Sequence, residues 1–306
     1  MSSNSSEKQN LYIIITNSLQ NDFIENKHIE KIKQDTPEEP WKIDYELCEE
    51  KWMEFFRDKR RTDEEKNINS FLKWIEKWME TNVLDTKSRE ILHSYHKFFK
   101  YYDHRVHVDV QESERLWYKD KLTNFITDLM NKGAESNRAE SRDVYEFIHL
   151  RDWHDPTGVS QRDEIINFGI HCIKGSHGAK FILPLADYIE KFKTFNQVIN
   201  SNSLSSFSDT NLEHVLKTII DNNNSSNELA KIGIFGVITN VKLKLLTFEL
   251  KVVHEFRNVY VCGDLCAGFN DKGHADGLNY MKNILGVKVY NEQKFRKKFN
   301  FPKPNY

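Results

Sequence analysis

The stretch LYIIIT, residues 11–16, is a short apolar run rich in β-branched side chains. A run of this kind is typical of a strand that is buried on both faces of a parallel sheet. Five more segments are candidate strands, the first three strong and the last two weaker: VYEFIHL at 144–150, IGIFGVIT at 232–239, NVYVCGDLC at 258–266, VINS at 198–201 and VKVYN at 287–291. The sequence therefore predicts a mostly parallel sheet that contains residues 11–16.

Helical patterns alternate with these strands. NLEHVLKTII at 211–220 and KLKLLTFELKVVHEF at 242–256 both place apolar residues at helical spacing. Strands that alternate with helices favour an α/β fold of three layers, α/β/α, around a mostly parallel central sheet. In such folds ligands bind at the carboxyl ends of the strands, so functional residues are expected directly after each strand.

Residues 24–143 interrupt the alternation and predict a helical insertion after the first strand. The segment is highly charged and holds five of the six tryptophans. Two amphipathic helices are expected in it, around Phe71–Met79 and Leu122–Met130, whose apolar stripes pack against each other or the core, or form a partner surface. The predicted organisation is a disordered tail at 1–10 and one domain at 11–306, interrupted by the insertion.

Composition narrows the possible functions. Charge is nearly balanced, with 44 Lys and Arg against 46 Asp and Glu, which argues against nucleic acid as a partner. The first ten residues are polar, and no apolar run approaches the ~20 residues of a membrane span, so neither export nor a membrane is expected. Four cysteines in 306 residues form no disulfide framework, which favours a reducing, cytoplasmic location.

A series of short motifs occurs in a characteristic order. These are SLQNDF at 18–23, RDWHDP at 151–156, FGIHC at 168–172, KGSHGAKF at 174–181, SLSSF at 203–207, GVITNVKL at 236–243 and GDLCAGFNDKGH at 263–274. Over residues 11–23 and 144–290 the series resembles the isochorismatase-like cysteine hydrolases, which include the nicotinamidases. The resemblance implies their fold, and it implies a dimer or tetramer, the usual assemblies of the family.

At the three catalytic positions of that family the sequence departs from the pattern. The family uses a Cys nucleophile at a helix N-terminus, an Asp base after the first strand and a Lys beside them, because the chemistry needs a thiolate. The matching positions here are Lys242, Ser18 and Ser201. A lysine attacks a carbonyl only as the neutral amine, and nothing in the sequence favours that form, so Lys242 is interpreted as structural. We therefore predict no catalytic residue of the family's kind.

Three residues with metal-ligand chemistry remain. Asp152 and His154 lie two apart at the end of a predicted strand, and His171 follows seventeen residues later. The resemblance implies that these positions bind a divalent metal, as they do in nicotinamidases, and an Asp/His₂ set suits Zn²⁺ or Fe²⁺/Mn²⁺. The alternative is that these residues pack and hydrogen-bond in the fold without any metal. His274 also matches a family histidine, but a core or capping role is expected for it.

Three functions are compatible with these observations. The first is a pseudoenzyme that acts as a scaffold, regulatory or ligand-binding subunit, since nucleophile, base and lysine are all replaced. The second is a hydrolase of a small amide or ester that uses a metal-bound water held by Asp152, His154 and His171. The third is a purely structural subunit that binds a protein partner, or a second copy of itself, through residues 24–143. A small-molecule ligand is expected only in the first two.

Overall fold

The computed structural model describes residues 10–24, 68–90, 110–138, 142–154 and 178–303, with isolated residues in the intervening gaps. The predicted tail at residues 1–10 lies outside the described residues except for Asn10, and so do most of residues 25–67. The chain forms two compact units. One comprises Met1–Leu19, Val108–Arg151 and Ile182–Tyr306, and the other comprises Gln20–His107 and Asp152–Phe181.

The first unit contains a six-stranded sheet with the order β3-β2-β1-β4-β5-β6. The pairs β1–β2, β1–β4, β4–β5 and β5–β6 are all parallel. This confirms the predicted α/β class with a parallel sheet. The strands are β1 (Asn10–Asn17), β2 (Asp143–Asp152), β3 (Asn196–Ser201), β4 (Lys231–Val237), β5 (Asn258–Ala267) and β6 (Lys288–Tyr290).

The run LYIIIT forms the body of β1, which lies between β2 and β4. Every residue of β1 after Asn10 is buried, because neighbouring strands cover its edges and helices cover both faces. Its register pairs Ile14 with Phe147 of β2 and with Gly233 of β4. A side chain at Gly233 would collide with the rings of Phe295 and Phe299, so the glycine allows the C-terminal helix to approach the sheet. The apolar run therefore forms a strand buried on both faces, as predicted, and the structure places it inside the sheet.

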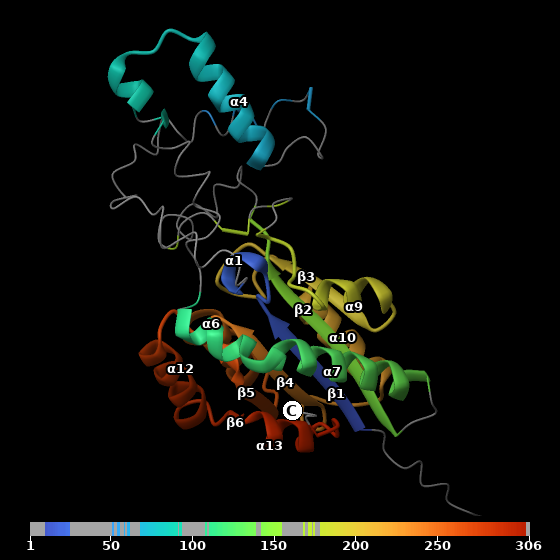
Figure 1. The fold of residues 1–306 in the computed structure, drawn as a ribbon. Coiled ribbons are helices and arrows are strands. Elements are labelled where there is room, and N and C mark those ends of the chain that lie inside the picture. Colours follow the sequence, from blue (N-terminus) through green and yellow to red (C-terminus); the bar gives the residue numbers. More distant parts are fainter. Residues whose placement is uncertain are drawn as a thin grey trace, which may run out of the picture. The chain divides into compact units, whose positions relative to one another are not determined.

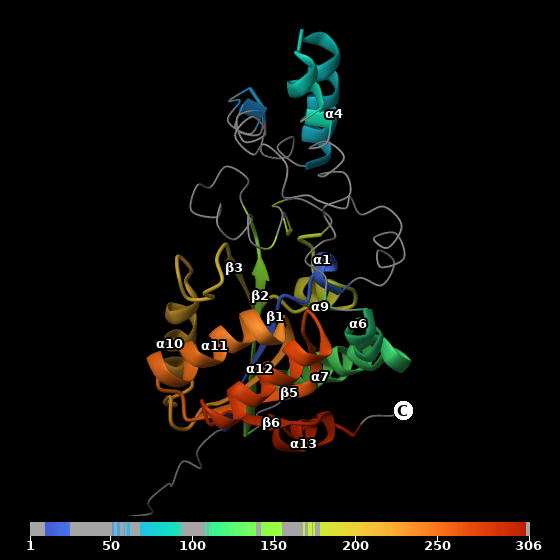
Figure 2. The same cartoon turned by 90° about the vertical axis from the view of Figure 1, so that its left-hand side faces the viewer.

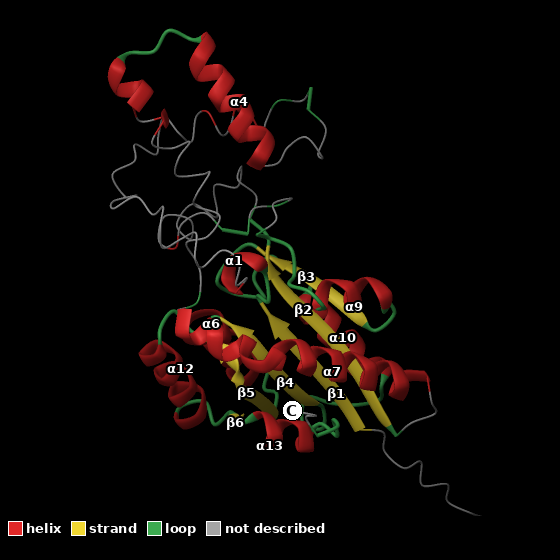
Figure 3. Cartoon of the chain, in the orientation of Figure 1, coloured by secondary structure: helices red, strands yellow, loops and turns green. Residues whose placement is uncertain are grey.

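Helices cover both faces of this sheet and complete the three layers. Figure 2 shows α10 and α11 on one side of the strands and α6 and α7 on the other, and Figure 3 shows the strands between helices. The helices of this unit are α6 (Val110–Trp117), α7 (Lys121–Arg138), α9 (Leu185–Lys191), α10 (Leu212–Asn222), α11 (Lys244–Phe248), α12 (Asp271–Asn283) and α13 (Glu292–Lys298). A 3₁₀ turn at Tyr118–Asp120 joins α6 to α7.

The apolar stripe predicted at 122–130 lies on α7 and is fully buried. Helix α7 runs across one face of the sheet (Figure 1), where the Phe125 ring meets the rings of Phe235 on β4 and Phe295 on α13 at centroid distances of 5.1 and 6.0 Å. The stripe therefore packs against the core of its own unit, which confirms the core interpretation for this helix.

The helix predicted at 242–256 begins earlier, at Thr239. It is continuous from Thr239 to Val253, with wide π-helical turns at Thr239–Leu243 and Glu249–Val253 on either side of α11. It follows β4 after only one residue, Ile238, so its first turn lies directly beyond a carboxyl end of the sheet. This turn contains Lys242.

The second unit contains α1 (Asn21–Ile24) and α4 (Ile68–Thr81). In α4 the stripe residues Phe71, Ile75 and Met79 are buried, and the Phe71 ring lies edge-on to Phe55 at 5.5 Å. Trp74 and Trp78 of the same stripe are only half-buried, so packing of this stripe against the other stripe or the core stays a prediction. The limits of the insertion at 24–143, and a partner surface in it, stay predictions. Among the residues that the structure describes, no helix is long and apolar enough to cross a membrane.

Candidate functional site

The strand order reverses between β1 and β4, and parallel α/β sheets usually bind ligands beyond the carboxyl ends of the strands at such a point. The three positions matching the catalytic residues lie at strand ends in this unit. Ser18 directly follows β1, Ser201 is the last residue of β3, and Lys242 lies in the first helical turn after β4. All three are buried, with 1%, 2% and 5% of their surface exposed.

Ser201 and Lys242 meet at one backbone carbonyl. The Lys242 Nζ atom donates a hydrogen bond of 2.7 Å to the carbonyl oxygen of Ser203, and the Ser201 hydroxyl donates to the same oxygen at 3.0 Å. Ser201 also reaches the Ser205 carbonyl at 3.1 Å. The Lys242 side chain is thus bonded to the loop after β3, and its structural role stays a prediction.

Ser18 has a left-handed backbone, with φ of 48°, which a non-glycine residue adopts only when its surroundings hold it there. Its backbone N–H donates to the Leu150 carbonyl at 2.9 Å, and its hydroxyl accepts from the Asn17 amide at 3.1 Å. The same Asn17 amide donates to the Val237 carbonyl at the end of β4. Ser18 therefore takes part in hydrogen bonds that join the ends of β1 and β2, and Asn17 extends them to the end of β4.

The cysteines that the structure describes offer no substitute thiolate. Cys172, Cys262 and Cys266 are all buried, and Cys48 lies outside the described residues. Burial raises the pKa of the Cys266 thiol to about 12 and raises the pKa of Cys262 well above its usual value. Both therefore stay protonated at neutral pH and behave as small buried apolar groups.

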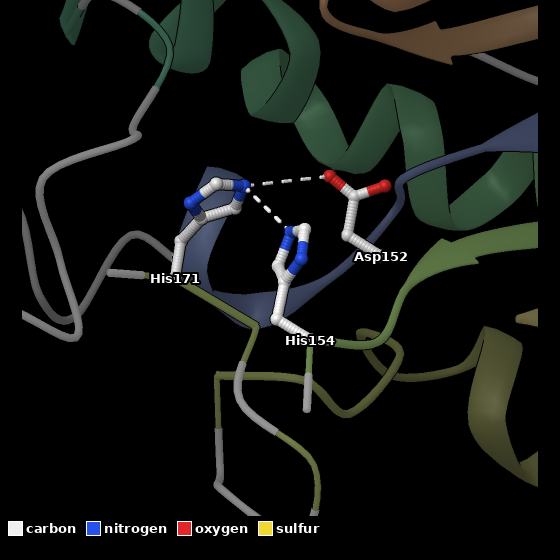
Figure 4. Close-up of side chains that lie close together, drawn as sticks. All are labelled: Asp152, His154 and His171. Carbon is white, nitrogen blue, oxygen red and sulfur yellow. Dashed lines mark hydrogen bonds and ion pairs between the residues drawn. The ribbon is translucent and has the colours of Figure 1, made fainter. Parts of the chain in front are cut away.

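Asp152, His154 and His171 come together in the second unit. Figure 4 shows the carboxylate and both imidazoles turned toward one another. The two Nε2 atoms are 3.1 Å apart, and the Nε2 atom of His171 lies 3.6 Å from Oδ2 of Asp152. All three side chains are at least 98% buried, and one ligand atom from each lies within 4.8 Å of the others. The structure thus brings together the residues that the sequence singled out.

Two of the three ligand separations are close to those expected around a shared divalent ion. Two ligands at ~2.1 Å from a tetrahedral Zn²⁺ lie about 3.4 Å apart, and at octahedral angles about 3.0 Å. The distances of 3.1 and 3.6 Å lie close to this range. The chemistry also fits, because neutral imidazoles and a carboxylate are good ligands for Zn²⁺, Fe²⁺ and Mn²⁺. The same nitrogen–nitrogen contact is a hydrogen bond when one imidazole carries the proton at Nε2.

His274 lies in a third cluster, which belongs to the first unit. Its Nδ1 atom is 2.9 Å from the Thr239 hydroxyl and 3.5 Å from the Glu112 carboxylate. Glu112 is buried on α6 and also accepts from Arg115 and from the Gly268 N–H. Burial acts to raise the pKa of Glu112, but Arg115 and its other partners hold the pKa below the usual value. His274 is therefore a half-buried residue that contacts Thr239 and Glu112, whereas the pairing of Glu112 was not foreseen.

Comparisons with known proteins complete the description of the site. No protein-family model matches the sequence, and no curated protein matches it. Solved structures do resemble the chain. Its structural neighbours are nicotinamidases and isochorismatase-like hydrolases, at low identity.

Three of these neighbours show the TM-scores, identities and coverages of such matches. An isochorismatase-like hydrolase from Alkaliphilus metalliredigens has a TM-score of 0.49 and 15% identity, over 94% of this chain and 99% of its own. A pyrazinamidase/nicotinamidase from Streptococcus mutans has a TM-score of 0.48 and 19% identity, over 61% and 91%. The pyrazinamidase of Pyrococcus horikoshii in complex with zinc has a TM-score of 0.45 and 20% identity, over 61% and 90%. Values this low assign neither a family nor a reaction to this chain.

Proposed function

We propose that this chain is a catalytically degenerate isochorismatase-like protein. In this proposal it is a pseudoenzyme that keeps a divalent-metal centre and serves as a ligand-binding, regulatory or scaffold subunit. One observation carries the loss of thiol chemistry: Lys242 stands at the nucleophile position, and its Nζ atom donates a hydrogen bond of 2.7 Å to the Ser203 carbonyl. The side chain at this position carries no thiol, so a thiolate cannot form there.

The metal centre is the second part of the proposal. Asp152, His154 and His171 would hold the ion through one carboxylate oxygen and two Nε2 atoms, because these atoms converge in a buried group. When bound, a divalent ion would supply Lewis-acid chemistry. The protein's contribution is to keep the three ligands buried and close together, so that their protonation and orientation suit a cation.

The same group favours one alternative function, a metal-dependent hydrolase of a small amide or ester. An Asp/His₂ set with remaining coordination positions is the arrangement that a catalytic metal site needs. This alternative requires no thiol and is therefore compatible with Ser18, Ser201 and Lys242. It differs from the pseudoenzyme only in whether substrate is turned over.

Turnover assays separate the two functions. The purified full chain is assayed with a panel of small amides and esters, nicotinamide included, with and without added Zn²⁺, Fe²⁺ or Mn²⁺. The pseudoenzyme proposal expects metal binding that His154→Ala abolishes and no turnover in any condition. Metal-dependent turnover that is lost in His154→Ala would establish the alternative. Metal-independent turnover that is lost in Lys242→Met would overturn both, because it would identify the lysine as a nucleophile.

Partners are also part of the proposal. We infer that residues 24–143 mediate self-association or bind another protein, since the segment is long, charged and rich in tryptophan. Light scattering of the full chain over a range of concentrations measures self-association, and a constant monomer mass excludes it. Affinity capture from the native host followed by cross-linking then asks whether a partner contacts this segment. Cross-links confined to other residues contradict the inference.

A further inference from the structure

Gln20 and Asp22, just after β1, have buried side chains that hydrogen-bond to backbone groups beside the metal ligands. The Gln20 amide oxygen accepts from the backbone N–H of Asp152 at 2.7 Å, and the amide nitrogen donates to the Asp152 carbonyl at 2.8 Å. That nitrogen also donates to the Ala179 carbonyl at 2.9 Å. Gln20 thus occupies both backbone polar groups of Asp152 and fixes the position from which this carboxylate projects.

Asp22 performs the corresponding role for the other side of the group. Its Oδ2 atom accepts from the backbone N–H of Cys172 at 2.6 Å, and Cys172 directly follows His171. The Cys172 carbonyl in turn accepts from the backbone N–H of His154 at 3.0 Å. Two successive hydrogen bonds, through the backbone of Cys172, therefore connect the Asp22 carboxylate to the backbone of both histidines.

Two further observations indicate that this connection is tightly constrained. Cys172 has a φ of 47°, a left-handed backbone that costs a non-glycine residue energy unless its contacts hold it. Gly178 lies against the Asp22 carboxylate so closely that a Cβ atom there would be 1.8 Å from Oδ1. The Asp22 N–H also donates to the Gly178 carbonyl at 3.2 Å. The carboxylate is therefore held on one side by Gly178 while it holds Cys172 on the other.

We propose that Gln20 and Asp22 are positioning residues of the metal centre. The proposal rests on the metal centre of the proposed function and deepens it. It assigns to residues 20–22 a structural role that does not depend on thiol chemistry. Residues that hold metal ligands typically contribute about 10- to 100-fold to metal affinity when they are removed. Their loss lets the ligands move apart, which weakens binding without changing the ligand set.

The test measures Co²⁺ binding to the full chain, through its visible absorption and through competition with Zn²⁺. We expect Asp22→Ala to weaken Co²⁺ binding about 10- to 100-fold and to change the absorption spectrum. Asp22→Asn keeps an acceptor oxygen for Cys172 and should stay within about threefold of the wild type, a rescue that separates the hydrogen bond from the charge. Gly178→Ala alters no bonding side chain but displaces the Asp22 carboxylate, so it should weaken binding in the same direction.

A matched control excludes a general loss of stability. Tyr145→Phe removes a buried hydrogen bond of 2.7 Å to the Phe299 carbonyl in the other unit. It should lower the melting temperature and leave Co²⁺ affinity unchanged. If folded Asp22→Ala and Gly178→Ala bind Co²⁺ with wild-type affinity and spectrum, the positioning role is refuted while the metal centre stands. If the wild-type chain itself binds neither Co²⁺ nor Zn²⁺, the metal centre fails and the positioning role fails with it.

Discussion

Two titratable side chains on β2 should give the protein opposite pH dependences of stability. His149 is completely buried and lies between the Thr16 hydroxyl, 2.8 Å from Nδ1, and the Asn196 amide oxygen, 2.7 Å from Nε2. Burial lowers the pKa of His149 to about 4. Glu146 lies three residues earlier, on the opposite face of the strand, and burial raises its pKa to about 7. In the folded protein both groups are neutral near pH 6.

The signs of the two effects follow from proton binding. Between pH 4 and 6.5 the unfolded chain binds a proton at His149 that the folded chain does not, so the free energy of unfolding falls as the pH drops. Between pH 4.5 and 7 the folded chain binds a proton at Glu146 that the unfolded chain does not, so the free energy of unfolding falls as the pH rises. Each effect amounts to at most about 1.4 kcal/mol per pH unit, and partial solvent screening makes the Glu146 figure an upper bound. In the wild type the two effects largely cancel.

A variant that lacks one of the two groups should therefore show the pH dependence of the free energy of unfolding that the other group causes. In Glu146→Gln the free energy of unfolding should fall by about 2–3 kcal/mol as the pH drops from 6.5 to 4.5. In His149→Gln it should fall by up to a similar amount as the pH rises over the same window. Urea unfolding followed by tryptophan fluorescence at half-unit pH steps measures both, and differences from the wild type remove groups that titrate in all three proteins. Parallel pH curves for the two variants would refute the reasoning.

Three more predictions concern packing, a buried ion pair and the metal centre. Gly277→Ala places a Cβ atom 3.0 Å from the Thr239 carbonyl oxygen. It should lower the free energy of unfolding by about 1–3 kcal/mol, although alanine favours a helix more than glycine does. A stabilised variant would contradict the close approach of α12 to Thr239. Arg115→Ala removes a guanidinium that is 34% exposed from the buried Glu112 carboxylate and should cost about 1–3 kcal/mol in the same urea assay, whereas an unchanged free energy of unfolding would show that the pair contributes little. Ser18→Ala should leave Co²⁺ affinity within about threefold of the wild type, and a loss as large as that of the positioning variants would show that the two sites are coupled.

Much of the fold could be predicted because buried strands leave a local signature. The β-branched runs at 11–16, 144–150 and 232–239 became β1, β2 and β4 with small changes at their ends. The packing partner of α7 could not be predicted, because an apolar stripe shows that a helix face is buried but not what buries it. Phe125 meets rings that lie more than a hundred residues away in the sequence. Such contacts depend on the tertiary arrangement and leave no local pattern.

In the candidate site, too, some features leave a local sequence pattern and others depend on the tertiary arrangement. Asp152 and His154 could be paired from their spacing, whereas His171 joined them only through the family resemblance, and the structure places its Nε2 atom 3.1 Å from that of His154. The shared acceptor of Ser201 and Lys242 was not foreseeable, because it is a backbone carbonyl and backbone groups carry no sequence signal. Roles that side chains perform through main-chain atoms are therefore the ones that the sequence conceals.

Ser18 and Gln20 lie two residues apart, yet the structure places their side chains in different hydrogen-bond networks. The Ser18 hydroxyl accepts from Asn17, and Asn17 reaches the end of β4, where thiol chemistry would take place. Gln20 instead bonds to the backbone of Asp152 and to the Ala179 carbonyl. A substitution of the Ser18 side chain therefore removes none of the Gln20 hydrogen bonds to Asp152 and Ala179, so the end of β1 and the backbone of Asp152 can be altered separately.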